Sequence, residues 1–97
     1  MGYKLITTPE TEKDIDQAVK WYVNTHKQTA KRFIAELRDV QKYIYKNPKK
    51  IAVKYNNIHV AFLKKFPYGI HYTFNDNMIT IVALFHTSEN PQKWNKR

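Results

Sequence analysis

The sequence contains no cysteine, only two glycines and no long apolar run. The absence of cysteine excludes disulfide bonds, cysteine-ligated zinc and thiol catalysis, and it is compatible with a reducing compartment. No apolar stretch approaches the roughly 20 residues that a membrane-spanning helix requires, and the first residues open no signal-peptide core. These absences predict a cytoplasmic protein that has no part in a membrane.

Acidic residues are also scarce, with 8 Asp+Glu against 17 Lys+Arg and a net charge of +9. No fold requires this excess, because like charges repel one another; it is typical of proteins that bind nucleic acid or a strongly acidic protein. The alternative is a basic surface without such a partner. A chain of 97 residues with 42% hydrophobic residues predicts one globular domain over residues 1–97.

The first half of the chain has the apolar spacing of helices. After a short strand over residues 2–7, Thr8 can cap a helix that begins at Pro9 and ends near residues 25–26. A second helix is expected from about residue 28 until Asn47 and Pro48 stop it. The short connection between the two helices predicts an antiparallel hairpin.

In the second half the apolar period falls from about 3.6 residues to about 2. Strands are expected over Ile51–Tyr55, Ile58–Phe66, Gly69–Asn75 and Met78–His86. Asn56-Asn57 and Asp76-Asn77 would form two-residue turns, because Asn and Asp tolerate positive φ. The pattern predicts an α+β fold in which an N-terminal strand and a helical hairpin pack on one face of a twisted antiparallel sheet.

The two turns also predict the register of the sheet, with Tyr55 opposite Ile58, Val53 opposite Val60, Asn75 opposite Met78 and Thr73 opposite Thr80. One face is then apolar and suits the helices. The other face collects Lys54, His59, Ala61, Leu63, Lys65, His71, Thr73, Thr80, Val82, Leu84 and His86. Such a face is either a basic surface that holds phosphates and moves protons, or an ordinary solvated sheet face.

Two motifs point to a known family. The run FPYGIHY at residues 66–72 resembles the FPYxIxY segment of the RelE/ParE toxin superfamily. The run ALFHTSENPQKW at residues 83–94 is similar to the closing AxxHxxRxPxxW segment of that superfamily, and residues 30–37 resemble the seam of its second helix. The resemblance spans nearly the whole chain and implies a helical hairpin packed on a twisted antiparallel sheet.

The resemblance implies the toxin of a type II toxin–antitoxin module, of the kind called ParE-like or plasmid-stabilisation proteins. Such toxins pair with a cognate antitoxin that is usually encoded beside them. RelE-like members enter the ribosome and cut messenger RNA, whereas ParE-like members bind DNA gyrase and stall it. We expect a ribosome-dependent mRNA endonuclease; the alternatives are a gyrase inhibitor without catalysis and an inactive relative that binds only its antitoxin and operator DNA.

Metal-independent RNA cleavage needs a base, an acid and cations that hold the phosphate. His86 is the first candidate for the acid or base and His71 is its candidate partner. The alternatives are that His86 shapes the turn into the tail and that His71 is a surface strand residue. The family commonly has arginine three residues after the histidine, where this chain has Glu89. A glutamate cannot bind phosphate, but it could serve as a base.

Six further residues are predicted to contact nucleic acid: Lys49, Lys50, Lys54, Lys64, Lys65 and Trp94. Lys49 and Lys50 could instead favour the negative end of the preceding helix, and Trp94 could clamp the tail to the sheet. No cofactor and no metal are expected, because the histidines lack ligand spacing and no Asp/Glu cluster accompanies them.

Overall fold

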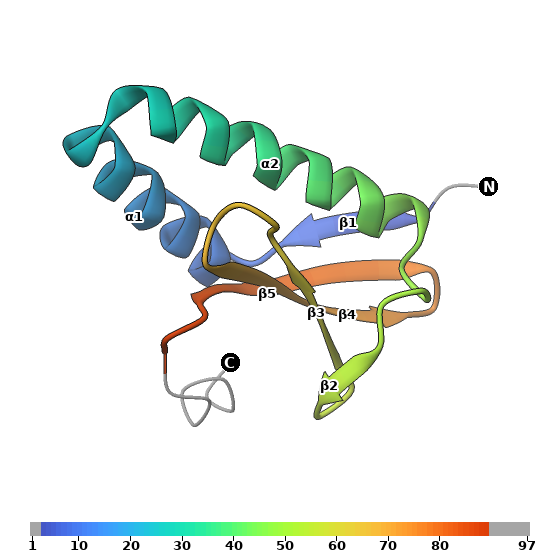
Figure 1. Cartoon of the computed structure of the whole chain (residues 1–97). Coiled ribbons are helices and arrows are strands. Elements are labelled where there is room, and N and C mark those ends of the chain that lie inside the picture. The colour runs from blue at the N-terminus through green and yellow to red at the C-terminus, as the bar shows by residue number, and fades with distance from the viewer. Residues whose placement is uncertain (1–2, 90–97) are drawn as a thin grey trace.

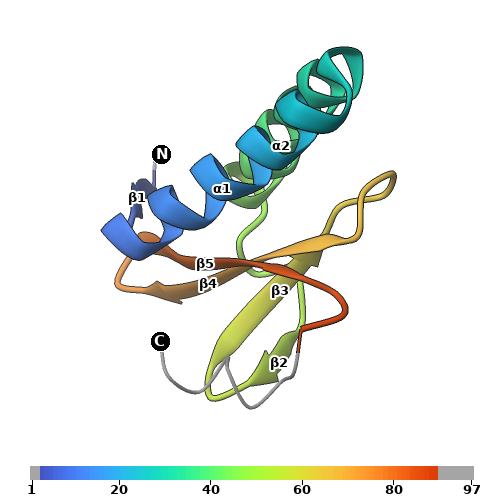
Figure 2. The ribbon, with the colours of Figure 1, turned by 90° about the vertical axis from the view of Figure 1, so that its left-hand side faces the viewer.

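The computed structural model describes residues 3–89. Its elements are, in chain order, β1 (Lys4–Thr7), α1 (Pro9–Thr25), α2 (Lys27–Lys46), β2 (Val53–Tyr55), β3 (Ile58–Phe62), β4 (Tyr68–Asn75) and β5 (Met78–His86). The strands form one sheet in the order β1-β5-β4-β3-β2. Both helices lie on the same face of this twisted sheet (Figures 1 and 2), which confirms the predicted α+β class.

The helix ends follow the predicted signals. The Thr8 hydroxyl accepts a hydrogen bond from the Thr11 backbone N–H at 3.2 Å, and Pro9 is the first residue of α1. A single residue, His26, separates the helices and caps α2 through Nδ1, which accepts from the Thr29 N–H at 3.4 Å. Such a short connection forces the chain to reverse, so α1 and α2 form the expected hairpin.

Both predicted two-residue turns are confirmed. All four turn residues have positive φ: Asn56, Asn57, Asp76 and Asn77. Each turn joins the expected closing pair, Tyr55 with Ile58 and Asn75 with Met78. The pairing beyond the first turn differs, because Val53 lies opposite His59 instead of Val60 after a register shift in β2. β2 and β3 are also shorter than predicted, and β3 ends at Phe62.

One strand direction differs from the prediction. β1 runs parallel to β5, with Lys4 opposite Met78 and Thr7 opposite Ile81, so the sheet is mixed and not wholly antiparallel. An alternating apolar pattern reveals which side chains share a face, but it does not reveal the partner or direction of a strand that is not joined to its neighbour by a hairpin.

The core lies between the helices and the sheet. Phe33 and Ile44 of α2 are 0% exposed, and the Phe33 ring packs within 5.2 Å of the ring centres of Phe66 and Tyr68. Tyr72 of β4 is equally buried, and its hydroxyl donates to the Pro48 carbonyl at 2.9 Å. Within residues 3–89, neither helix is long and apolar enough to cross a membrane.

Candidate functional site

The structure separates the histidines that were predicted to share one open face. His71, in the middle of β4, is 1% exposed and lies on the outer face, which we define as the sheet face turned away from the helices. His86, at the end of β5, lies on the helix side, where its ring meets Tyr68 edge-on. His59 stacks on Tyr72 with 4.8 Å between ring centres, also on the helix side. The prediction of one working surface that contains His71 and His86 is therefore wrong.

A β-bulge in β5 is the cause. His71 lies opposite Ala83, but the next residue of β4 lies opposite Ile81, so Val82 is inserted in β5 between the two pairs. An inserted residue reverses the alternation of side chains beyond it. The reversal turns His86 toward the helices, although unbroken alternation would leave it on the same face as His71.

The side chains of β3 also lie on the opposite faces of the sheet from those predicted. Ala61 lies opposite Ile70, and Ala61 and Leu63 belong to the core beneath the helices. Val60 and Phe62 therefore lie on the outer face. The β3–β4 connection is not a two-residue turn, so turn geometry could not fix the register between these strands.

His71 is part of a small packed cluster on the outer face. The Tyr55 hydroxyl lies 2.8 Å from its Nδ1, and the Phe85 ring meets it edge-on with 5.0 Å between ring centres. The exposed Lys54 shares this side, with its ammonium 5.5 Å from the centre of the Phe62 ring. A histidine that is 1% exposed offers a phosphate almost no surface, so His71 has the environment of a core residue.

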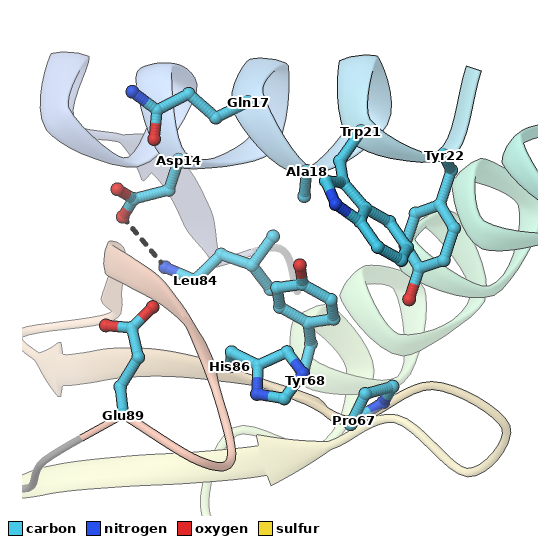
Figure 3. A pocket seen from close by; sticks show the side chains of 10 residues that line it. All are labelled: Asp14, Gln17, Ala18, Trp21, Tyr22, Pro67, Tyr68, Leu84, His86 and Glu89. Carbon is cyan, nitrogen blue, oxygen red and sulfur yellow. Dashed lines mark hydrogen bonds between the residues drawn. The ribbon is translucent and has the colours of Figure 1, made fainter. Parts of the chain in front are cut away.

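His86 instead lines a cleft, which we call the histidine cleft (Figure 3). The cleft has a volume of about 470 Å³ and is lined by Asp14, Gln17, Ala18, Trp21, Tyr22, Pro67, Tyr68, Leu84, His86 and Glu89. Figure 3 shows Asp14 on α1 and Glu89 on the turn after β5, so the two carboxylates enter from opposite walls. The Tyr68 hydroxyl points from β4 toward α1. Of the predicted catalytic residues, His86 and Glu89 are thus brought together and His71 is not.

A hydrogen bond joins α1, which forms one wall of the cleft, to β5 beyond its bulge. Asp14, Ala18 and Tyr22 follow one another at helical spacing, so one stripe of α1 faces the sheet. β1 pairs with β5 only as far as Ile81, which leaves the β5 backbone beyond it without a neighbouring strand on that side. Asp14 Oδ2 accepts the Leu84 N–H there at 3.2 Å. The carboxylate thereby fastens α1 to the end of the strand.

The orientation of His86 is set by the turn that follows it. Its Nδ1 accepts the Ser88 backbone N–H at 3.0 Å and lies 2.7 Å from Ser88 Oγ. Because Nδ1 accepts, the neutral ring carries its proton on Nε2. The Glu89 N–H donates to the His86 carbonyl at 3.0 Å, which closes the same turn. This arrangement agrees with the alternative that His86 shapes the turn into the tail.

Two tyrosines in the cleft wall are partly shielded from water. Burial raises the pKa of Tyr22. Burial also raises the pKa of Tyr68, with smaller contributions from Tyr22 and from Glu89. Both phenols therefore remain neutral at physiological pH and can donate or accept hydrogen bonds.

The described lining of the cleft differs in charge from the chain as a whole. Although the net charge is +9, the described lining residues include Asp14 and Glu89 and neither a lysine nor an arginine. The described lining also carries donors, which are the Gln17 amide and the Trp21 indole N–H. In the part of the chain that the structure describes, no three His, Asp or Glu side chains form a group that could hold a metal ion.

The predicted nucleic-acid contacts do not surround His86. Lys49 and Lys50 follow α2, Lys54 lies on β2, and Lys64 and Lys65 lie in the β3–β4 connection. All five are exposed, but none lines the histidine cleft. The sixth predicted contact, the tryptophan at position 94, lies outside the described residues.

A second hollow, which we call the α2–β3 groove, was not predicted. It has a volume of about 1060 Å³ and is lined by Thr29, Arg32, Ala35, Glu36, Asp39, Val40, Tyr43, Ile51, Val60, Ala61, Phe62, Lys64, Lys65 and Phe66. At one end the Glu36 carboxylate accepts the backbone N–H groups of Lys64 and Lys65. β2 pairs with β3 only at Ile58 and His59, so the rest of the β3 edge borders the groove.

The sequence contains only weak signals for these two hollows. Asp14 and Glu36 have the pattern of ordinary polar residues on helix surfaces, and each instead accepts backbone N–H groups of the sheet or its connections. The FPY segment is a recognisable motif, yet the position of Tyr68 in a cleft wall depends on the bulge and on the long-range packing of α1.

A helical hairpin on one face of a five-stranded mixed sheet is the fold that the resemblance to RelE/ParE toxins implies. The sequence profile for the ParE toxin of type II toxin–antitoxin systems, parDE, matches residues 5–91. The chain therefore belongs to the ParE toxin family, and an antitoxin partner follows from membership of a toxin–antitoxin system.

A solved structure supports the same fold. The structure described as the chromosomal ParDE TA system from P. aeruginosa matches with a TM-score of 0.78, covering 89% of this chain and 97% of that chain at 14% sequence identity. At that identity the likeness concerns the fold alone. No curated protein matches the sequence.

Proposed function

We propose that this protein stops growth by binding DNA gyrase, without a catalytic step of its own, and that a cognate antitoxin encoded beside it neutralises it. Membership of the ParE family supports gyrase as the target, because gyrase binding is the activity that the resemblance implies for ParE-like members. The alternative activity, cleavage of mRNA on the ribosome, is the competing outcome of the experiments below.

The match to the ParE family is the observation that carries this proposal, and the described lining of the histidine cleft agrees with it. An RNA-cleaving site must stabilise a phosphate that gains negative charge in the transition state, and enzymes do so with cations or aligned N–H donors. His86 is accompanied in its cleft by Asp14 and Glu89, and the described lining contains no Lys or Arg. Two carboxylates would repel the scissile phosphate. The cleft is therefore better suited to a protein surface than to an RNA backbone.

The α2–β3 groove is our proposed seat for the antitoxin. Arg32, Lys64 and Lys65 line it beside apolar side chains such as Val40 and Phe66, and the carboxylates of Glu36 and Asp39 line it as well, so its cations exceed its carboxylates by one. An acidic amphipathic segment would bury its apolar side in the groove and pair its carboxylates with these cations. The open β3 edge next to the groove could also take an added strand.

The decisive experiment compares two readouts after the toxin is produced alone. We expect that purified gyrase loses supercoiling activity when the toxin is added and that transcripts in arrested cells remain intact. Normal supercoiling with excess toxin, together with transcripts cut in induced cells, would reject the gyrase proposal in favour of the endonuclease. Normal growth of cells that produce this protein without an antitoxin would reject the proposal that it stops growth.

A pair of aromatic substitutions locates the gyrase contact. Trp21 is 60% exposed at the cleft, and Tyr45 is 41% exposed on α2 outside both hollows. Exposed tryptophans are common anchors of protein interfaces. We expect Trp21→Ala to reduce gyrase inhibition by at least about tenfold, and Tyr45→Ala, the matched control, to leave it unchanged. Equal effects of the two variants would place the contact elsewhere.

A further inference from the structure

A stripe of cations runs along the outer side of α2. The helix contains six Lys or Arg residues and two acids among its 20 residues. Five of the six cations follow one another at intervals of four or seven residues, which places them on one side of a helix with about 3.6 residues per turn. We call them the α2 stripe: Lys27, Lys31, Arg38, Lys42 and Lys46. All five are exposed.

The stripe is separated from the acidic side chains of both helices. Glu36 and Asp39 line the α2–β3 groove, whereas no stripe residue lines that groove or the histidine cleft. On α1, the carboxylate of Asp14 is bound to β5 and that of Asp16 pairs with Lys20. Within residues 3–89, none of the five stripe cations forms an ion pair. Because Figure 1 shows none of the described elements above α2, the stripe is a band of positive charge that is open to solvent.

The arrangement of these cations does not stabilise the helix. Lys27 is the first residue of α2 and the first turn holds no acid, although cations are unfavourable at the positive end of the helix dipole. α1 has the opposite pattern, with Glu10 and Glu12 in its first turn. Only Lys46 lies in the last turn, where a cation is favourable, and stripe neighbours four residues apart repel one another. Charges of both signs would solvate a helix face equally well, so charge of one sign indicates an anionic partner.

We infer that the α2 stripe binds the phosphate backbone of duplex DNA, namely the DNA that gyrase holds. The choice of this DNA rests on the proposed function, because a toxin bound to gyrase lies beside the DNA on which gyrase acts. A rise of about 1.5 Å per residue spreads the stripe over about 28 Å of helix axis. Duplex DNA presents one phosphate charge per about 1.7 Å of its own axis, and its major groove admits an α-helix. Several stripe cations can therefore meet phosphates at the same time.

The surroundings of the stripe favour a phosphate backbone over an acidic protein. An amphipathic acidic segment needs an apolar seat beside the cations, and Val40 and Phe66 provide one in the α2–β3 groove. The stripe lies outside both hollows, and Tyr45 is the exposed aromatic residue between its cations. Tyr45 carries no charge, so it adds nothing to the release of counterions that drives phosphate binding. The deep, narrow major groove of duplex RNA also admits a helix less well than that of DNA.

The first test measures binding of the whole protein to a fluorescein-labelled DNA duplex of about 20 base pairs, which is longer than the stripe. We expect fluorescence anisotropy to give a Kd on the order of micromolar at about 50 mM salt. Each neutralised phosphate contributes about −0.9 to the slope of the logarithm of the association constant against the logarithm of salt concentration. Three to five contacts therefore predict a slope of about −3 to −4.5. No binding at about 100 μM protein would overturn the inference.

Two triple variants with the same change of net charge make this test specific. The stripe variant combines Lys31→Gln, Arg38→Gln and Lys42→Gln. The control variant changes three exposed lysines outside α2: Lys13→Gln, Lys20→Gln and Lys54→Gln. We expect the stripe variant to bind DNA at least about tenfold more weakly, with a slope less negative by about 2 to 2.7, and the control variant to lose less than about threefold. Equal losses in the two variants would overturn the inference.

The stability of the stripe variant shows whether it remains folded. Its melting temperature should not fall, because glutamine is a good helix former and the repulsion within the stripe is relieved. Two further polyanions identify the partner, namely an RNA duplex of the same sequence and poly-glutamate of equal charge. We expect each to bind at least about threefold more weakly than DNA at the same salt concentration. Equal or tighter binding of the RNA, or of poly-glutamate, would assign the stripe to that class of partner and overturn the inference.

A supercoiling assay separates this inference from the proposed function. The stripe variant should need at least about fivefold more protein than the control variant for half-inhibition of gyrase. Equal half-inhibiting concentrations would overturn the inference that the bound DNA is the DNA that gyrase holds. DNA binding through the stripe by a protein that leaves gyrase active would reject the proposed function and keep the site. Full inhibition of gyrase by a protein that does not bind DNA would reject the site and keep the function.

Discussion

The two faces of the sheet bury their side chains in different ways. The helix side buries large apolar rings and aliphatic chains beneath α1 and α2, with Phe33 and Ile81 at 0% and 1% exposed. The outer face buries a smaller cluster in which a histidine, His71, contacts Tyr55 and Phe85. One histidine of the pair expected to act together is thus a packing residue, and the other, His86, lines a cleft. Residue type and spacing alone do not distinguish these two environments.

The largest effect is expected on the helix side. Phe33→Ala would remove a ring that packs against Tyr22, Phe66 and Tyr68 and would leave a cavity. We expect a loss of about 3–5 kcal/mol in the free energy of unfolding, measured by urea denaturation. Val23→Ala, at a site 42% exposed on α1, is the control and should change stability by less than about 0.5 kcal/mol. A loss below about 1 kcal/mol for Phe33→Ala would mean that this core is not packed as described.

The two histidines provide the next comparison. His71→Ala should lower the free energy of unfolding by about 2–4 kcal/mol, because it removes buried contacts and the imidazole nitrogen that lies 2.8 Å from the Tyr55 hydroxyl. His86→Ala should cost less than about 1 kcal/mol, because the Ser88 N–H that it releases is exposed and can bind water. Urea denaturation of both variants measures the difference. Similar losses of stability in the two variants would contradict the assignment of His71 to a packed cluster and of His86 to a cleft.

Much of the fold is predictable because it is encoded locally. Thr8 and Pro9 mark the start of a helix, and Asn56-Asn57 and Asp76-Asn77 adopt the positive φ that their short side chains tolerate. Residues 66–72 and 83–94 carry enough of the family pattern to indicate the ParE relationship by their amino-acid order alone. These signals need no knowledge of distant parts of the chain.

The site is less predictable because it depends on distant contacts. The insertion of Val82 has no distinctive sequence signal, yet it decides on which face His86 lies. The register of β3 against β4 and the parallel pairing of β1 with β5 are set by packing beneath the helices and not by turns. The same alternating pattern therefore predicts the strands correctly and groups the histidines wrongly.

A smaller effect tests a buried polar contact on the helix side. Tyr72→Phe removes the hydroxyl that donates to the Pro48 carbonyl at 2.9 Å, and we expect a loss of about 1–2 kcal/mol at pH 8. Burial raises the pKa of Tyr72 to about 12, with a smaller contribution from Tyr43. The unfolded chain releases this proton near pH 10 while the folded protein retains it, so stability falls between about pH 10 and 12.

The alkaline slope separates Tyr72 from the other tyrosines. In Tyr72→Phe, the free energy of unfolding should fall less steeply with rising pH than in the unmodified protein. The difference between the two slopes is at most about 1.4 kcal/mol per pH unit. Urea denaturation at several pH values between about 8 and 11.5 measures the slope. The exposed Tyr45, changed to phenylalanine as a control, should leave the slope as it is in the unmodified protein. An unchanged slope in Tyr72→Phe would contradict the raised pKa.

The smallest expected effect on stability discriminates best between the two functions. Lys54 is exposed on the outer face, and its ammonium lies 5.5 Å from the centre of the Phe62 ring, so Lys54→Met should cost only about 0.5 kcal/mol. If Lys54 held RNA for cleavage, the variant would lose toxicity at nearly full stability. If the protein binds gyrase through the histidine cleft on the other side of the sheet, the variant should still arrest growth. Growth curves of cells producing equal amounts of the two proteins decide the question, and loss of arrest would make the outer face a working surface after all.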